Sequence, residues 1–537
     1  MKKRLSTLAL VLALLLTMLP AAIAEGEAPV FNAYDETVAI TVMGTDEKDT
    51  ATTYDSSMPD RASANENAWI DAYKEYLNID VTRITPEDEE AMIANLNTMM
   101  AGGELPDVMI VPKSMFYVLA ENGVLKDLSA DFEAYDSERW NAIRDSYGAD
   151  VYAAGMYEGE LLGLPYVENF YNCTSVLWIR QDWLDALNLE APATIDELEA
   201  VAQAFVDNKM GGENTVGIGL NIMGDWSTDI SPIMAAYGVP LYTWVQDEEG
   251  KYVYSNTLDA NRDGLLKLQD WYKKGLIKSD FAVSDLLSED IANGVCGMYF
   301  APGWHSVTWI QANILNDENS QWTAVRIPSL DGDYVTQTTN ASVGRFICVR
   351  SDYEHADAIF RMKELEAYVY YEATTSDPLY TRLMQTEDNY HIWNLMVFRG
   401  LQRGDLDLYK SGVVVDAIAN EVPCGEEAPI ISSVYYAIYN NVFNNDRSGL
   451  EYKLVFCDSY PIVSDILVNG SVQAQFNGPI TENMALYQDT INASLNSAMV
   501  KVIMGEDISV FDQAVSDWYA NGGQAITDDV NAFYEAN

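Results

Sequence analysis

A tryptophan placed directly after a buried strand is the side chain in this sequence best positioned to contact a ligand. Residues Gly297–Phe300 form a short apolar run, and a glycine-tryptophan turn containing Trp304 follows it. In open α/β sheets, ligands bind beyond the carboxyl ends of the strands. Thr45 and Asp46 follow the first predicted strand in the same way. We therefore expect these three side chains to contact a ligand.

Side chains for catalysis are scarce by comparison. The three histidines, His305, His355 and His391, have no metal-binding spacing, and His305 fits a structural role better than ligand contact. The sequence contains neither a G-x-S-x-G nucleophile elbow nor a G-x-x-x-x-G-K-[ST] phosphate loop. A glycosidase needs only two carboxylates, and 82 acidic residues supply such pairs by chance. We predict a protein that is not an enzyme, with glycosidase activity as a remote alternative.

The elements that must position these side chains alternate between strands and helices. Alternating or continuous apolar residues predict strands at 38–42, 79–81 and 107–111. Apolar residues at helical spacing predict helices at 69–77 and at 92–103, the second closed by two glycines. Three strands alternating with two helices within about 75 residues predict a parallel sheet with helices on its faces.

The rest of the chain continues this pattern and becomes mainly helical toward its end. Thr194 and Glu197 form a capping box at the start of a helix. Two amphipathic helices near the C-terminus are expected to stop at Gly505 and at Gly522–Gly523. Further elements are predicted as strands ending near 179 and at 216–220, 297–300 and 343–349, and as helices at 263–274 and 353–372.

The N-terminus has the three parts of a secretory signal peptide in order. Basic residues at 2–4 precede an apolar run at 8–19, which is too short to span a bilayer, and a small-residue cleavage site at 22–24. We assign residues 1–24 to the signal and the polar residues 25–36 to a flexible leader. No cysteine follows closely, so we expect an exported protein, extracellular, at the cell surface or periplasmic, without a lipid anchor.

Composition excludes several classes of partner. The formal net charge of −51 repels nucleic acid and anionic membranes, and it disfavours a polyanionic ligand unless a local basic pocket is present. Five cysteines without a metal-binding spacing leave at least one free thiol, and Cys296 and Cys348 lie in apolar runs as small core residues. A length of 537 residues exceeds one compact core and predicts two lobes.

Five segments of the sequence, in order, resemble a known family. They are Leu105–Val111, Glu121–Ser129, Gly163–Leu198, Phe300–Trp309 and Phe476–Pro479. The third segment has the family's order of a Gly-Leu-Pro turn, a strand, an aromatic-rich helix and a capped helix. The chain resembles the extracellular solute-binding proteins of ABC importers, in the group that binds maltodextrins and other oligosaccharides and includes longer, lipoprotein-like members.

The resemblance implies a two-lobed α/β fold, the type II periplasmic-binding-protein fold. Each lobe is expected to hold a mainly parallel sheet flanked by helices, with several chain crossings at the hinge. The implied division gives residues 37–163 and 341–470 to the first lobe, and residues 164–340 and 471–537 to the second.

The resemblance also implies a ligand site between the lobes. The residues at family binding positions are Trp304, Trp226, Glu168, Tyr166, Asp225 and Phe476. Related sugar binders place stacking aromatics at the two tryptophans, and at Glu168 a carboxylate that accepts bonds from sugar hydroxyls. Such a set suits a pyranose, whose apolar face packs on indole and whose hydroxyl edge needs polar partners.

The implied function is that of the substrate-binding component of an ABC transporter. The protein is expected to capture a small solute, a neutral oligosaccharide, by hinge closure, and to deliver it as a monomer to membrane permease subunits. Two alternatives remain: a binder of peptides or other metabolites with the same fold, or a receptor that presents a bound glycan to a sensor kinase. No cofactor is expected.

One feature of the family is altered in this sequence. Longer relatives carry an acidic, EF-hand-like calcium loop after the capped helix, but here residues 207–215 include Lys209 and Met210, which cannot ligate a hard cation. A second stretch, from Asp259 to Asp270, has EF-hand oxygen spacing but lacks the bidentate glutamate. We expect no metal at either stretch, and we expect a helix to begin within the second.

Overall fold

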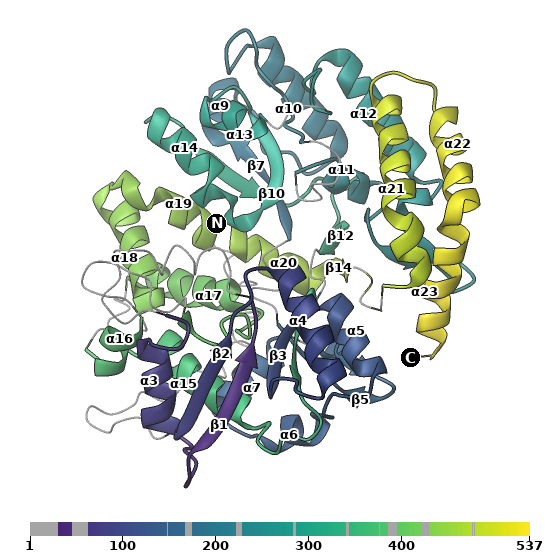
Figure 1. Ribbon diagram of the computed structural model, residues 1–537. Coiled ribbons are helices and arrows are strands. Elements are labelled where there is room, and N and C mark those ends of the chain that lie inside the picture. Colours follow the sequence, from purple (N-terminus) through teal and green to yellow (C-terminus); the bar gives the residue numbers. More distant parts are fainter. Residues whose placement is uncertain are drawn as a thin grey trace.

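Two separate sheets, one in each lobe, organise the chain (Figure 1). The structure is a computed structural model, and it describes residues 31–45, 63–147, 149–166, 174–221, 228–282, 286–339, 343–374, 376–384, 395–421, 429–474, 476, 478 and 480–536. The first sheet has the strand order β2-β1-β3-β13-β6 and the second has the order β10-β7-β11. Each sheet has its own buried apolar core, so the predicted two-lobed α/β fold is confirmed. The predicted signal peptide lies outside the described residues.

The first sheet begins with three parallel strands, as the sequence predicts. These are β1 (Val38–Met43), β2 (Ile79–Ile84) and β3 (Val108–Pro112), with β1 in the middle. Strands β13 (Arg345–Val349) and β6 (Leu164–Pro165) extend the sheet in antiparallel ladders beyond β3. Every residue of β3 is buried, because helices cover both faces of the sheet there.

Helices with well-defined ends connect these strands. Helix α3 (Ala68–Leu77) begins at Asn67, whose side chain accepts hydrogen bonds from the N–H groups of Trp69 and Ile70. Helix α4 (Glu89–Gly102) ends at Gly103, whose φ of 72° few residues other than glycine adopt easily. The other elements of this lobe are α5 (Lys113–Glu121), α6 (Ser129–Ala134), α7 (Glu138–Asp145), α8 (Ala149–Ala153), β4 (Met156–Tyr157), β5 (Glu160–Leu161), α15 (Ala358–Tyr371) and α16 (Pro378–Leu383).

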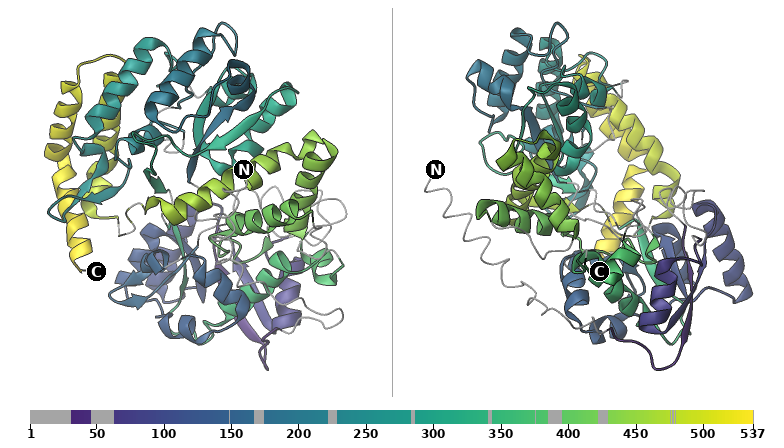
Figure 2. Two further views of the ribbon diagram at one scale, coloured as in Figure 1. Left: turned by 180° about the vertical axis from the view of Figure 1, so that it is seen from behind. Right: turned by 90° about the vertical axis from the view of Figure 1, so that its left-hand side faces the viewer.

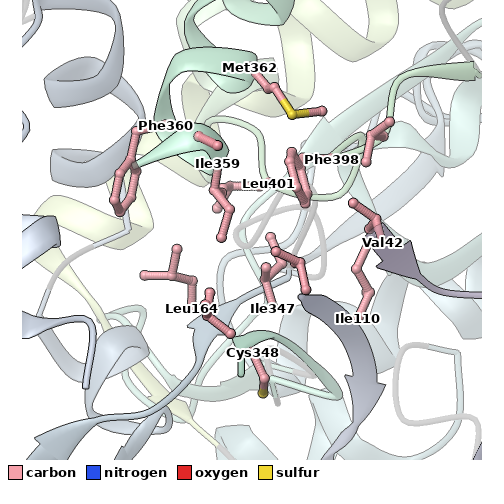
Figure 3. Close-up of a cluster of buried hydrophobic side chains, with 14 of the residues drawn as sticks. Val42, Ile110, Leu164, Ile347, Cys348, Ile359, Phe360, Met362, Phe398 and Leu401 are labelled. Atoms are coloured by element: carbon pink, nitrogen blue, oxygen red, sulfur yellow. The ribbon is translucent and has the colours of Figure 1, made fainter. Parts of the chain in front are cut away.

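The core of the first lobe joins the sheet to α15 and to the loop 395–401. Side chains of the strands, such as Val42 and Ile347, lie opposite Ile359, Phe398 and Leu401 (Figure 3). All five side chains are at most 1% exposed. Segments more than 200 residues apart in sequence therefore share one core, which explains why the early strands need the later helix to be covered.

A buried charge network fixes the loop after α15. The Glu366 carboxylate, on α15, accepts hydrogen bonds from Tyr73 Oη (2.6 Å) and the Phe398 N–H (3.2 Å) and pairs with Lys363 Nζ at 3.0 Å. Lys363 also donates to the Phe398 carbonyl at 3.3 Å, and the Tyr73 hydroxyl accepts from the Val397 N–H. The side chains of Glu366 and Lys363 are 0% and 2% exposed, so their charges depend on one another.

The second sheet differs from the prediction of a mainly parallel sheet. Strands β10 (Met298–Pro302) and β11 (Trp322–Val325) both pair antiparallel with β7 (Ser175–Arg180). The direction follows from the chain path, because β7 leads away from the hinge and β10 leads back toward it. The predicted strand at 216–220 makes only isolated parallel bridges, from Val216 and Gly219, to the β10 side of the sheet.

Both faces of the second sheet are buried, in two different cores. Along β7, Leu177 and Ile179 belong to one core, and Val176 and Trp178 belong to the other. The first face is covered by α9 (Gln181–Leu187), α10 (Ile195–Asp207), α11 (Ser231–Ala236), α12 (Asn261–Lys274), the hairpin of β8 (Trp244–Gln246) and β9 (Tyr252–Tyr254), α21 (Glu482–Ile503), α22 (Ser509–Trp518) and α23 (Gln524–Ala536).

The second face is covered by helices that come largely from residues 406–469. They are α13 (Leu287–Ala292), α14 (Trp309–Asn316), α17 (Leu406–Ala419), α18 (Pro429–Asn444), α19 (Leu450–Lys453) and α20 (Tyr460–Asn469). This packing differs from the predicted placement of all of 341–470 in the first lobe. Val414, Tyr435 and Val463 share a core with Trp178 and not with the first sheet, so helical periodicity alone did not indicate the partner of these helices.

Three segments of the described chain run through the hinge between the lobes, and the chain also passes from the first-lobe core at Leu401 to the second lobe at Leu408. The first runs from β6 to β7, and the other two contain β12 (Thr336–Thr339) and β14 (Ser471–Ala474), which pair in parallel. The buried Gln337 side chain ties the first two crossings together, because its amide accepts from the Ser175 N–H at 2.9 Å and donates to the Ser175 carbonyl at 3.1 Å. The prediction of several crossings is confirmed.

The C-terminal helices run along the side of the second lobe, and α23 points toward the first lobe (Figures 1 and 2). Helix α21 ends at Ile503, close to the predicted stop at Gly505. The second helix ends at the predicted Gly522–Gly523, because Asn521 and Gly522 (φ 127°) depart from helical geometry, and a new helix, α23, begins at Gln524. A glycine with positive φ therefore separates two consecutive helices here.

The predicted flexible leader is wrong for its last six residues, 31–36, which pack on the first lobe. The Phe31 ring meets the Tyr368 ring at 5.6 Å, and Tyr34 Oη donates to Asp357 at 2.6 Å. The Arg361 guanidinium lies 4.1 Å from the centre of the Tyr34 ring, and burial raises the pKa of Tyr34. Two aromatic side chains in a polar stretch were the signal for this docking.

Replacing Tyr34 with alanine is expected to lower the free energy of unfolding by about 1–3 kcal/mol, because it removes a charged hydrogen bond and a cation–π contact. The exposed neighbour Asp35 provides the matched control, and Asp35→Ala should change stability by less than about 0.5 kcal/mol. Chemical unfolding followed by tryptophan fluorescence measures both. Equal, negligible effects of the two substitutions would mean that this segment is loose after all.

The described cysteines lie where small core residues were expected. Cys296 and Cys348 are 0% exposed, and together with Cys457 they are free thiols. Burial raises the pKa of the Cys296 thiol to about 12, which keeps it protonated and unreactive. Cys173 and Cys424 lie outside the described residues. Among the described helices, none combines the length and the apolar composition that crossing a membrane requires.

Candidate functional site

One edge of the first sheet brings together two of the predicted site residues. Arg345 opens β13 opposite Pro112, the last residue of β3, and the Tyr166 N–H donates to the Arg345 carbonyl at 3.0 Å. Lys113 follows Pro112 directly, and Thr45 lies just past the end of β1 on the same side. Thr45, Lys113, Arg345 and Tyr166, which we call the first-lobe edge, thus lie where the parallel strands end and where α/β sheets bind ligands.

The Arg345 guanidinium spans this edge. Its Nη1 donates to Thr45 Oγ1 at 3.4 Å and its Nη2 donates to Glu89 Oε2, in the first turn of α4, at 3.3 Å. Both contacts are long, and the side chains of Arg345 and Glu89 are 33% and 47% exposed. The guanidinium is therefore held in place by its neighbours but retains donors that face solvent.

Lys113 reaches from the first-lobe edge to the segment that follows β14. Its Nζ donates to the Phe476 carbonyl at 3.3 Å and lies 5.7 Å from the centre of the Phe476 ring. Phe476 in turn packs against Phe533 and Tyr534 at the end of α23, with ring centres 5.3 and 5.9 Å apart. Phe476, a predicted site residue, thus joins the C-terminal helix to the first lobe at the cleft.

The electrostatic environment of Lys113 is unusual. Within the described part of the chain, its ammonium has no carboxylate partner, and burial lowers its pKa to about 8. The group is still mostly protonated at neutral pH. Lys113 is also the first residue of α5, where the helix dipole favours negative and not positive charge.

Trp304 lies on the hinge side of the second sheet. Strand β10 ends at Pro302 opposite Ser175, the first residue of β7, and η4 (Gly303–Val307) follows. The Gly303 carbonyl accepts a hydrogen bond from Ser459 Oγ at 2.9 Å. A Cβ added at Gly303 would lie only 2.8 Å from Ser459 Oγ. Glycine is therefore required at this close approach, and it fixes the turn that presents Trp304.

The Trp304 indole is half-buried, and one of its neighbours is His305. The two ring centres are 4.5 Å apart, and His305, which is 6% exposed, also meets the Trp309 ring at 4.6 Å. This packing agrees with a structural role for His305. Among the described residues, the Trp304 indole N–H has no hydrogen-bond acceptor, so both the ring surface and the donor are open to a ligand.

The Tyr166 ring packs against the loop after the first-lobe core. A Cβ at Gly400 would lie 2.2 Å from an atom of the Tyr166 ring, so the loop backbone touches the ring. Tyr166 is half-buried as a result, with its position fixed between Gly400 and Arg345. The side of the Tyr166 ring that touches Gly400 is therefore buried, and only the rest of the ring can face the cleft.

Four predicted site residues, Asp46, Glu168, Asp225 and Trp226, lie outside the described residues, and their roles stay predictions. Analysis of the sequence missed Lys113 and Arg345. Lys113 follows the carboxyl end of a predicted strand, so the strand-end rule applied to basic residues indicates it. Arg345 begins β13, and only the antiparallel direction of that strand brings it to the same edge.

The residues of the loop 207–215 do not fit a calcium ion. Lys209 Nζ lies 2.7 Å from both carboxylate oxygens of Glu213, so an ammonium already neutralises that carboxylate. Asp207 accepts from Gln203 instead. Across the described residues, no cluster of three acidic, histidine or cysteine side chains has metal-binding geometry. The second EF-hand-like stretch, from Asp259, is the entry of α12, as expected.

A polar cavity of about 380 Å³ lies at the other end of the second sheet. It contains Arg180, the last residue of β7, which makes two hydrogen bonds to Asp182 and stacks on Trp183 with its guanidinium 4.9 Å from the ring centre. The charge of Arg180 is thus neutralised within the protein, in contrast to that of Lys113. This cavity is remote from the hinge and from the first-lobe edge.

Comparison with known proteins agrees with this arrangement. Residues 68–386 match the family described as bacterial extracellular solute-binding protein. Lipoprotein LipO of Bacillus subtilis is 23% identical over 464 residues, which cover 82% of this chain and 84% of LipO.

Solved structures of two sugar-binding proteins resemble the fold. The substrate-binding protein FusA of Streptococcus pneumoniae, solved with kestose, aligns over 93% of this chain and 99% of its own, with a TM-score of 0.55 and 15% identity. An HMO-binding solute-binding protein of Bifidobacterium longum infantis aligns over 94% and 99%, with a TM-score of 0.54 and 16% identity. The family match covers more than half of the chain, and the protein therefore belongs to the bacterial extracellular solute-binding proteins.

Proposed function

We propose that this protein is the substrate-binding component of an ABC transporter and that it captures an oligosaccharide between its lobes. The observation that carries the proposal is the pair of facing edges at the hinge. Trp304 lies at the hinge-side end of the second sheet, and Thr45 and Tyr166 lie at the carboxyl edge of the first. Flat aromatic rings beside hydrogen-bonding groups match the two kinds of surface that a sugar ring presents.

Closure of the lobes supplies the mechanism. A ligand that touches both edges does so only when the lobes are closed, so it binds the closed form more tightly and shifts the population toward it. The segments at the hinge, joined through Gln337 and the β12–β14 pair, serve as the hinge of this motion. The closed protein then delivers its ligand to permease subunits in the membrane.

The relatives support a sugar as the ligand class. FusA carries kestose in its structure, and the Bifidobacterium longum protein is named for HMO binding. Family members and structural neighbours are binding proteins and not enzymes, which agrees with the absence of catalytic motifs in the sequence. As a family described as extracellular, they also support export of this chain.

Replacing Trp304 with alanine is expected to weaken oligosaccharide binding by about 10- to 100-fold, because stacking and apolar contact with a sugar ring are lost. Isothermal titration calorimetry against a panel of neutral and acidic oligosaccharides measures the effect on each one that binds. Trp304→Phe is the matched control, since it keeps a flat ring and should lose much less. Tight binding of peptides without binding of any saccharide would contradict the proposed ligand class.

A further inference from the structure

Unneutralised basic side chains are uncommon in this protein. The sequence has 31 lysines and arginines against 82 aspartates and glutamates, so a cation can find a carboxylate almost anywhere. Other buried cations do so: Arg180 pairs with Asp182, Lys363 with Glu366 and Arg403 with Asp405. Among the described residues, Lys113 bonds only the Phe476 carbonyl, and burial lowers the pKa of its ammonium to about 8. Lys126 also bonds only a backbone carbonyl, but the Asp131 carboxylate lies close enough to interact with it.

The position of Lys113 adds to this contrast. Partial burial of an ammonium costs free energy unless an opposite charge is near, as the lowered pKa of Lys113 indicates. The first turn of α5 opposes a cation and favours an anion in the same place. One carbonyl at 3.3 Å uses one of the three ammonium donors, so two remain for another acceptor.

A second cation lies on the same edge. Lys113 donates its backbone N–H to the Gly344 carbonyl at 2.9 Å, which places it beside Arg345. The Arg345 guanidinium reaches Thr45 and Glu89 only through long contacts and is 33% exposed. Two residues with basic side chains are thus neighbours at the carboxyl edge of β3. Among the described residues, Glu89, which is 47% exposed, is the one carboxylate paired with either of them.

A role for Lys113 only in joining the first lobe to Phe476 explains less of its burial and its charge. If Lys113 served only to join the lobes through Phe476, a neutral donor such as glutamine would make the same bond to a carbonyl without the cost of a buried charge. The Phe476 ring, 5.7 Å from the ammonium, favours a positive charge weakly, whereas an anionic partner favours it much more strongly. The overall charge of −51 repels an anionic partner from the rest of the surface, whereas the first-lobe edge carries positive charge locally.

We infer that Lys113 and Arg345 bind a carboxylate of the ligand, so that the solute is an acidic oligosaccharide containing uronic acid residues rather than the neutral sugar that the sequence favours. This inference rests on the proposed function, because it assigns the ligand class of the same cleft. Arg345 supplies the planar fork that matches a carboxylate, and Lys113 supplies a point charge. Trp304 provides an apolar surface for a sugar ring, which a uronic acid keeps.

Paired ligands that differ only in charge test the inference. The probes are trisaccharides and tetrasaccharides of galacturonate, mannuronate and guluronate, their methyl esters, and the neutral sugar kestose. Calorimetry at neutral pH should show binding of at least one uronate, and its methyl ester should bind about 10- to 100-fold more weakly because the charged hydrogen bonds are lost.

Substitution of the lysine should reproduce this difference. Lys113→Met keeps the length and most of the volume of the side chain, and it should weaken binding of the acid about 10- to 100-fold while leaving the ester unchanged. Lys126→Met is the matched control, since Lys126 also donates to a backbone carbonyl, that of Tyr353, but lies at the opposite end of β13. Arg345→Met gives a second, independent variant.

The outcomes separate this inference from the proposed function. Equal affinity for acid and ester, or unchanged affinity for the acid in both Lys113→Met and Arg345→Met, overturns the carboxylate site. Binding of neutral sugars alone, weakened by Trp304→Ala, also overturns it but leaves the proposed function intact. If no saccharide in the panel binds, both fail.

Discussion

Replacing Glu366 with alanine is expected to lower the free energy of unfolding by about 3–5 kcal/mol. The substitution leaves the Lys363 ammonium buried without its carboxylate, 2% exposed, and removes the acceptor for Tyr73 Oη and the Phe398 N–H. Each of these losses is costly because water cannot replace the missing partner. Denaturant unfolding of the first lobe, followed by circular dichroism, measures the change.

Two companion variants assign this loss to the stranded charge. Lys363→Met/Glu366→Gln removes both charges and keeps an amide oxygen as an acceptor, so it should recover part of the stability that Glu366→Ala loses. Glu121→Ala removes an exposed carboxylate from the end of α5 and should change stability by less than about 0.5 kcal/mol. A double variant no more stable than Glu366→Ala would show that the charge is not the cause.

Replacing Gln337 with alanine is expected to lower the free energy of unfolding by about 2–4 kcal/mol. Gln337 satisfies both the N–H and the carbonyl of Ser175, and these two groups lie on the side of β7 where β11 ends at Val325. The glutamine amide therefore stands in for a missing strand partner at the hinge. Without it, two buried backbone groups lose their hydrogen bonds.

Thermal unfolding measured by calorimetry tests this expectation. Gln337→Glu is informative beside the alanine, because a carboxylate still accepts from the Ser175 N–H but cannot donate to the Ser175 carbonyl. Gln513→Ala is the control, since Gln513 is exposed on α22. If Gln337→Ala unfolds at the temperature of the unaltered protein, the amide does not brace the hinge.

Local patterns in the sequence predicted most individual elements correctly. The alternation at 38–42, the capping box at Thr194 and the glycine after α12 each depend on a few adjacent residues, and each is found in the structure. Strand directions in the second sheet and the location of 406–469 depend on which distant surfaces meet. An amphipathic helix shows that one of its faces is buried, but not against which sheet.

The site was predictable to a similar extent. The strand-end rule located Thr45, and applied to Lys113 it would have located one charged residue of the edge, whereas Arg345 reaches the edge only because β13 runs antiparallel to β3. What the sequence did not show is that the Lys113 ammonium meets a carbonyl and not a carboxylate, because this depends on a contact with Phe476, 363 residues away. The choice between neutral and acidic ligands depends on that contact.

The burial of both faces of the second sheet also determines when this lobe can fold during synthesis. Strands β7, β10 and β11 are complete by residue 325, but the segments that seal their two faces include residues 414–463 and 484–530. A nascent chain emerges from its N-terminus, so these strands and the helices α9 to α14 are synthesised before the remaining cover of both faces. The core of the second lobe is therefore completed only when the C-terminal helices have been synthesised.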